Sequence, residues 1–171
     1  MGELEEYHAV DPQGPHAILV RRKAEMQAQV THVFLKPKHG APVFPVAGCT
    51  AVAEQGLVGD VSYGRGTRQV PLIDLETLKE FDLKPGEVRE NLTVSGTSLS
   101  GAGQLSVGEV LLEITGDCAP CSTMDEVRPG LQERIRGRRG VLARVIRGGQ
   151  IQVGDRVSTQ PALRTVQRAG S

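Results

Sequence analysis

The chain has 171 residues, and its 20 Lys and Arg residues balance 20 Asp and Glu residues, so the formal net charge is zero. This balance does not support a general nucleic-acid-binding surface. No apolar run approaches the ~20 residues that a membrane helix needs. The acidic N-terminus, residues 1–11, lacks the apolar core of a signal peptide. We therefore expect a cytoplasmic protein that binds neither nucleic acid nor a membrane.

The composition predicts a mostly β protein. Hydrophobic residues make up 39% of the chain and aromatic residues only 3%, so Val, Leu, Ile and Ala must form the core. The 21 glycines and 10 prolines between Val-rich segments favour many short strands joined by tight turns. We expect one domain over residues 17–158, with a loose arm at 1–16 before it and a tail at 159–171 after it.

The N-terminal third of the domain reads as strands. A short strand is expected over residues 17–20, and a longer one where apolar residues alternate between Met26 and Phe34. The alternation makes His32 a half-buried strand side chain. A further β-prone segment, 43–53, contains Cys49, which we expect to be a buried and unreactive thiol.

A glycine-rich region follows. Residues 56–60 form a tight turn, since two glycines allow backbone angles that other residues avoid. The next loop carries Arg65 and Arg68, and such loops can present guanidinium groups and backbone N–H groups to an anion. After a strand, Asp74 can cap a short helix over residues 75–81.

Two segments in the second half resemble each other, 104–110 and 150–157. Each has alternating apolar residues, then a glycine followed by an acidic residue, and then a return to a strand. This pattern is typical of antiparallel barrels. A further short helix is expected over residues 131–136. The fold class we predict is mostly β with a few short helices, arranged as a closed antiparallel β-barrel.

Two of the three cysteines, Cys118 and Cys121, follow an apolar run. Gly116, Asp117 and Pro120 predict a turn there, which would place both thiols at the rim of the scaffold. Four interpretations compete: a zinc site, a thioredoxin-type dithiol, plain packing, and a reactive or metal-ligating thiolate in an anion-binding pocket.

The residues favour the last interpretation while leaving the others open. Zinc needs four ligands, and the chain has no second Cys-x-x-Cys or His-x-x-x-His pair. A thioredoxin-type dithiol needs a helix N-terminus in a βαβ setting, where this chain has strands and turns. Positive charge lowers the pKa of a nearby thiol and binds phosphate. The loops that would gather at one end of a barrel supply such charge from Arg65, Arg68, Arg89, Arg138 and Arg139.

An ordered set of motifs resembles the MOSC domain, which occurs at the C-terminus of molybdenum cofactor sulfurases and as stand-alone bacterial proteins. The resemblance runs from about residue 28 to residue 158. Its motifs are Gly56-Leu-Val-Gly-Asp60, Arg68-Gln-Val70, Arg89-Glu-Asn-Leu-Thr-Val-Ser-Gly96, Val107-Gly-Glu109, Pro120-Cys121, Gly137-Arg-Arg-Gly-Val-Leu-Ala-Arg-Val145 and Val153-Gly-Asp155.

The resemblance implies a barrel similar to the β-barrel domain of pyruvate kinase. It also implies that the protein binds the molybdenum cofactor (molybdopterin) or carries sulfur to metal–sulfur centres, and so takes part in catalysis. In either case Cys121 is the expected working residue, as persulfide carrier or as molybdenum ligand. Cys118 is a candidate partner thiol. The alternatives are a cofactor-dependent reductase of N-hydroxylated compounds and a non-catalytic cofactor-binding module.

The resemblance also suggests which residues bind the cofactor and which proteins are partners. Ser62 stands where many members carry histidine. The lysine-bearing domain of the large sulfurases is missing, so we expect no pyridoxal phosphate on this chain and a cysteine desulfurase or a molybdoenzyme as partner. The candidate cofactor-binding residues are Arg68, Arg89, Asn91, Arg138, Arg139 and Asp60.

Overall fold

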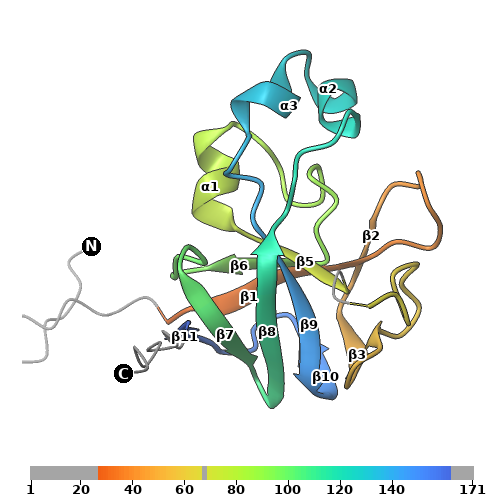
Figure 1. The fold of residues 1–171 in the computed structure, drawn as a ribbon, viewed down its shortest axis with the longest axis vertical. Helices are drawn as coiled ribbons and strands as arrows, with labels where there is room; N and C mark the ends of the chain where they lie inside the picture. The colour runs from red at the N-terminus through yellow and green to blue at the C-terminus, as the bar shows by residue number, and fades with distance from the viewer. Residues whose placement is uncertain (1–26, 67–68, 163–171) are drawn as a thin grey trace, which may run out of the picture.

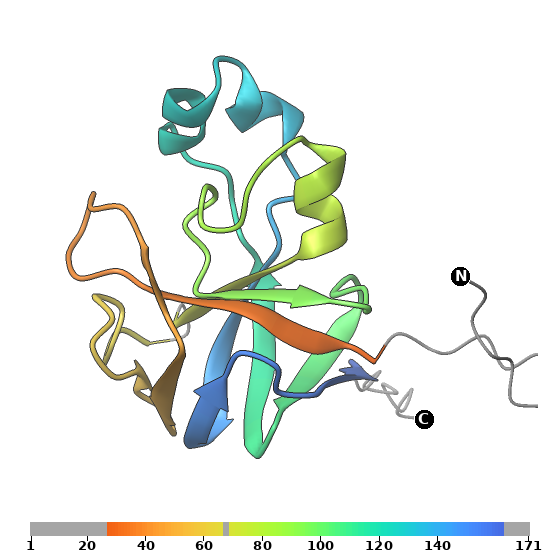
Figure 2. The same ribbon diagram turned by 180° about the vertical axis from the view of Figure 1, so that it is seen from behind.

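The computed structural model describes residues 27–66 and 69–162. The predicted arm at 1–16, the strand at 17–20 and Arg68 lie outside the described residues. Figure 1 shows β-strands in one half of the molecule and short helices grouped at the other end, and Figure 2 shows the same arrangement from behind. The fold is therefore mostly β with a few short helices, as predicted.

Eight strands form the larger sheet in the order β11-β7-β8-β9-β5-β6-β1-β2. Their bounds are β1 Gln29–Leu35, β2 Phe44–Val46, β5 Val70–Asp74, β6 Leu92–Ser95, β7 Ala102–Val107, β8 Val110–Asp117, β9 Val141–Arg147 and β11 Val157–Pro161. A three-stranded sheet has the order β10-β3-β4, with β3 Gly48–Val52, β4 Gly56–Leu57 and β10 Gly149–Gln152. The helices are α1 Leu75–Glu80, α2 Thr123–Val127 and α3 Leu131–Arg134.

The predicted closed antiparallel barrel is wrong, because the large sheet curls into an open half-barrel. Its edge strands, β11 and β2, do not pair, and among the described residues one isolated bridge, Gln29 with Arg156, links β1 to the residue just before β11. The pairing is not wholly antiparallel either, since β5 and β6 run parallel. A parallel pair needs a crossover connection, and α1 lies on that connection. The comparison with pyruvate kinase stays a prediction.

The two similar segments, 104–110 and 150–157, form different strand pairings, and this difference helps to keep the sheet open. The first forms the expected hairpin, in which β7 and β8 pair around Gly108 and Glu109. In the second, β10 pairs with β3 of the small sheet whereas β11 pairs with β7. The strand β11 also takes in the first residues of the predicted C-terminal tail.

Two hydrophobic clusters support the fold. The larger one lies between the sheets and is aliphatic, as the composition predicted, with Leu57, Leu105 and Leu112 fully buried. The smaller cluster lies beneath the helices. Its members are Ile73, Leu78, Leu83, Val88, Met124, Leu131 and Ile135. The helical end therefore has its own core, which supports the loops between the helices.

The strand β1 contains a bulge between Val30 and His32, which interrupts the simple alternation. Val30 and Val33 are both buried as a result. His32 is half-buried, as predicted, and its ring stacks on Phe34 with centroids 5.9 Å apart. The bulge shifts which residues face the core by one position.

The turn predicted at Gly116 and Asp117 is wrong. Both residues belong to β8, where they pair with Leu142 and Val141 of β9 after a bulge beyond Ile114. The long partner strand continues to offer hydrogen bonds there, and these outweigh the turn preference of the two residues. The chain leaves the sheet only after Asp117, so both cysteines lie on the connection to α2. In the described part of the chain, no helix is long and apolar enough to span a membrane.

Candidate functional site

Cys121 lies on the connection between β8 and α2, and its side chain is exposed. Its sulfur lies 2.6 Å from the hydroxyl oxygen of Thr123, and its carbonyl accepts the N–H of Met124 at 2.9 Å as the helix begins. Cys118 is half-buried on the same connection, and its N–H donates to Gly140 at 3.0 Å. The prediction that Cys49 is buried is confirmed.

Arg139 connects this segment to a second loop. The residue as a whole is only 9% exposed. Its Nη1 donates to the carbonyl of Ala119 at 2.6 Å and to Cys121 Sγ at 3.5 Å, while its Nη2 donates to the carbonyl of Val88 at 3.0 Å. One guanidinium group therefore fixes the cysteine segment against the loop that carries Val88 and Arg89.

The surroundings of Cys121 favour the thiolate. Partial burial raises the pKa of its thiol, but hydrogen bonds with the side chain and backbone of Thr123 and the charge of Arg139 outweigh that effect. The pKa therefore lies below its ordinary value. Burial instead raises the pKa of Cys49 to about 11. Of these two thiols, the exposed one therefore has the lower pKa.

Lys36 is a cation that the sequence analysis did not select. Its Nζ donates to the carbonyl of Arg89 at 3.3 Å, and its backbone N–H donates to Asp60 Oδ1 at 2.7 Å. Burial lowers the pKa of its ammonium group, and the charges of Asp60 and Cys118 oppose this while those of Arg139 and Arg89 reinforce it. The sequence signal that could have identified Lys36 is its position at the end of a predicted strand and ahead of a proline-rich loop.

Asp60 and Asn91 are buried beneath this cation and support it. Asn91 Nδ2 donates to Asp60 Oδ1 and to the carbonyl of Phe34, both at 2.9 Å. Asp60 also accepts the N–H of Ser62 at 2.9 Å through Oδ2. Since neither side chain is more than 5% exposed, their contacts place them behind the site, where they hold Lys36 in position.

The described arginines separate instead of gathering around one mouth. Arg138 forms an ion pair with Glu80 and lies over the ring of Phe81, with 5.6 Å from its Cζ to the ring centroid. Arg65 Nη1 lies 2.6 Å from His39 Nε2 in a neighbouring loop. Arg89 Nη2 lies 4.0 Å from a carboxylate oxygen of Glu126 in α2. Of the predicted arginines that the structure describes, Arg139 is the one in contact with Cys121.

Three buried polar atoms in this region lack a hydrogen-bond partner among the described residues: Glu90 Oε2, Asn91 Oδ1 and Arg139 Nε. Such atoms are rare in folded proteins, and here they accompany an exposed thiol with a lowered pKa, a lysine and a guanidinium. A thiolate is a soft ligand that suits molybdenum, and the two cations suit a phosphate. Within the described ranges, no group of three or more His, Cys, Asp or Glu residues is placed to hold a metal. The residues therefore fit a metal that takes one ligand from the protein and its other ligands from the cofactor that carries it.

The fold and the site define a small MOSC-type protein. Residues 68–158 match the model of the MOSC domain, and the chain belongs to that family, which is linked to the molybdenum cofactor sulfurases. A search of curated proteins finds no match.

Solved structures of stand-alone proteins share the fold. The YuaD protein of Bacillus subtilis is 18% identical with a TM-score of 0.65, covering 77% of this chain and 94% of its own. YiiM of Geobacillus stearothermophilus is 20% identical with a TM-score of 0.64, covering 78% and 75%. YiiM of Escherichia coli is 19% identical with a TM-score of 0.58, covering 77% and 69%. At these identities the similarity establishes the fold alone.

Proposed function

We propose that this protein carries sulfur as a persulfide on Cys121, for delivery to a metal–sulfur centre. The observation that carries the proposal is the exposed sulfur of Cys121, held between Thr123 and the guanidinium of Arg139, with a pKa below its ordinary value. A sulfur carrier needs a cysteine that ionises readily and that large partners can reach. The lowered pKa of Cys121 supports the first requirement, and its exposed side chain supports the second. The family's link to molybdenum cofactor sulfurases supports the same assignment.

The loading step is a transfer between two sulfur atoms without net oxidation. The Cys121 thiolate attacks the outer sulfur of a persulfide on a cysteine desulfurase. The donor's sulfur–sulfur bond breaks, and its electron pair leaves with the donor thiolate. The proton stays on the transferred sulfur, so Cys121 gains a terminal SH group. Delivery reverses this pattern: a nucleophilic thiolate of the acceptor protein attacks the outer sulfur, the sulfur–sulfur bond on Cys121 breaks, and its electron pair regenerates the Cys121 thiolate.

In this proposal Arg139 and Lys36 have separate tasks. Arg139 contacts the sulfur directly and stabilises its negative charge before and after transfer. Lys36 lies near Cys118, Arg139 and Arg89, where it adds positive charge for an anionic acceptor. The molybdenum cofactor fits as such an anion: Cys121 would ligate the metal, Lys36 would hold its phosphate, and the bound cofactor would supply redox chemistry.

The test is to load the purified full chain with sulfur. The protein is incubated with a cysteine desulfurase and cysteine, and intact mass spectrometry then looks for one added sulfur atom. The wild type and Cys49→Ala should gain it, whereas Cys121→Ser should not. A Cys118→Ser variant shows whether the neighbouring thiol takes part. An unmodified wild-type chain, or equal loading of Cys121→Ser, would refute sulfur carriage.

A second preparation, from cells that make molybdopterin, separates the alternatives. Stoichiometric molybdenum that is lost in Cys121→Ser supports cofactor binding through this thiolate. Reduction of an N-hydroxylated compound by that preparation would identify a reductase. Bound molybdenum without either activity would identify a cofactor-binding module.

A further inference from the structure

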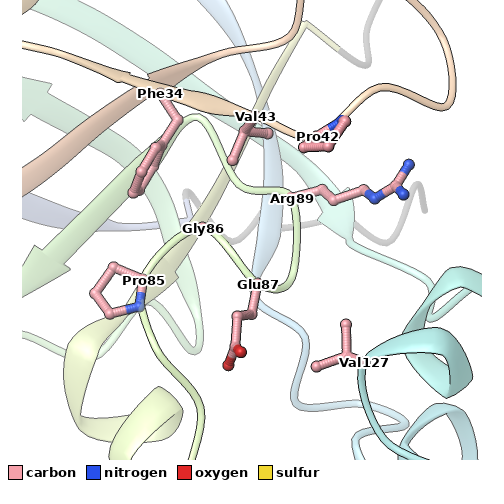
Figure 3. Close-up of a pocket in the computed structure, with 8 residues that line it drawn as sticks. All are labelled: Phe34, Pro42, Val43, Pro85, Gly86, Glu87, Arg89 and Val127. Carbon is pink, nitrogen blue, oxygen red and sulfur yellow. The ribbon is translucent and has the colours of Figure 1, made fainter.

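A cavity of about 330 Å³ lies at the same end of the molecule, between β1, the loop before β6 and α2. Figure 3 shows its lining side chains, which come from these separate segments. Most of the wall is apolar and is supplied by Phe34, Pro42, Val43, Pro85 and Val127. This volume is at the lower end of the range for small-molecule pockets, and such pockets combine apolar walls with a few polar groups.

Arg89 is the cation in this wall, and its backbone is held in a rare conformation. Its φ of +63° lies in the left-handed region, which residues other than glycine seldom adopt. Two bonds keep it there: its N–H donates to Gly86 at 3.0 Å, and its carbonyl accepts Lys36 Nζ at 3.3 Å. Backbone strain of this kind persists where the surrounding structure imposes it, often at ligand sites.

The guanidinium of Arg89 is available for a ligand. Its only side-chain partner in the described ranges is Glu126, at 4.0 Å, and that carboxylate side chain is 73% exposed. A guanidinium has five N–H donors, so this long contact leaves most of them uncommitted. Arg139, by contrast, makes three hydrogen bonds with its two terminal nitrogens.

Glu87 is the acidic residue of the lining, and it does not neutralise Arg89. Its Oε2 accepts the N–H of Lys84 at 2.7 Å, which commits the carboxylate to its own loop. In Figure 3 this carboxylate points away from Arg89. The cavity therefore pairs an apolar body with one available cation.

We propose that this cavity binds a small organic anion. The ligand would place an apolar body, of about one ring, against Phe34, Val43 and Val127, and a carboxylate or phosphate group at Arg89. The site is distinct from the Cys121 sulfur but lies at the other end of α2, since Cys121 lies two residues before that helix and Val127 ends it. The proposal does not rest on sulfur carriage by Cys121.

The test follows backbone amide NMR shifts of the full chain during titration with three probes. These are phenyl phosphate, benzoate and the uncharged benzyl alcohol. Shifts at Gly86, Arg89 and Val127 with one or both anions, and weaker binding of benzyl alcohol, are expected. Which anion binds better distinguishes a phosphate ligand from a carboxylate ligand.

Substitutions then assign the binding to the cavity. Arg89→Gln should weaken anion binding tenfold or more, since a charge-assisted contact is lost, and should leave the affinity for benzyl alcohol unchanged. Val127→Trp, at a residue that is 38% exposed, should fill the space and abolish binding of all three probes. Arg65→Gln serves as the matched control and Cys121→Ser as the functional one, and neither should change binding.

Absent shifts in the wild type, shifts that map outside the cavity, or equal anion affinity in Arg89→Gln would overturn the proposal. Because Cys121→Ser is expected to bind normally, a failed persulfide assay has no bearing on this result. Thermal unfolding of each variant establishes that the protein compared is folded.

Discussion

Replacing Gly140 with alanine should be among the most destabilising single-methyl changes in this protein. Gly140 follows Arg139 directly, has a φ of +89°, and accepts the N–H of Cys118 at 3.0 Å. A Cβ at this position would lie 2.0 Å from the carbonyl oxygen of Leu72 and 3.0 Å from its carbonyl carbon. Since these atoms belong to β5, the clash can be relieved only by moving a core strand.

Gly137 provides the matched control in the same loop. Its φ is +74°, and an added Cβ would meet nothing within 4 Å. Alanine there incurs only the left-handed backbone cost of about 1–2 kcal/mol. Alanine at 140 incurs that cost plus an overpacking cost of about 1–3 kcal/mol or more. The expected losses of unfolding free energy are therefore about 2–5 kcal/mol for Gly140→Ala and about 1–2 kcal/mol for Gly137→Ala.

Urea unfolding followed by circular dichroism measures both values. The rate of Cys121 alkylation in the same variants reports the local effect, because the displaced loop carries Arg139. Gly140→Ala should alter that rate, whereas Gly137→Ala should leave it near the wild-type value. Equal destabilisation by the two substitutions would refute the packing argument at Gly140.

Three further predictions concern other parts of the structure. Iodoacetamide should modify Cys121 well before Cys49 in the native protein. Arg139→Gln should slow the alkylation of Cys121 about fivefold at neutral pH, because losing a cation at about 4 Å in a water-like medium removes ~1 kcal/mol of thiolate stabilisation. An unchanged alkylation rate would argue against that contact. Burial raises the pKa of the Glu90 carboxyl. Its protonation therefore stabilises the fold at low pH, and this contribution declines as pH rises above the unfolded-state value of about 4.3 through the higher folded-state pKa. Glu90→Gln should flatten this part of the stability–pH curve, and a curve identical to that of the wild type would contradict the buried-carboxyl argument. Asp74→Ala removes the bonds to Thr77 N and Oγ1, at 2.8 and 2.7 Å, and should lower the free energy of unfolding in urea by about 1 kcal/mol; no loss would mean that the cap is unimportant.

Local features of the fold could be predicted from the residues alone because they depend on near neighbours in the chain. The strand that becomes β5 follows from its apolar run, and Asp74 then caps α1 as predicted, three residues before Thr77. The hairpin at Gly108 has the two-residue turn that its sequence predicts. Family membership follows in the same way, from the order and spacing of short motifs.

Local preference was insufficient where a distant strand competed for the same residues. Gly116 and Asp117 favour a turn, yet β9 offers them pairing partners, and the strand continues through both. The second Gly-acid turn also leads its strands to two different sheets. Whether the barrel closes depends on such pairings between remote strands, which sequence periodicity does not encode.

The composition, the short strands, the aliphatic core and the close spacing of Cys118 and Cys121 were determined by the sequence itself. The surroundings of that pair were decided only by tertiary structure. Arg138 and Arg139 are adjacent in the chain, yet one contacts Glu80 and the other contacts Cys121. Lys36 gains its place through Arg89, 53 positions away. Charged side chains of one kind look alike in a sequence, and only the folded backbone determines which of them lies within hydrogen-bonding distance of the sulfur.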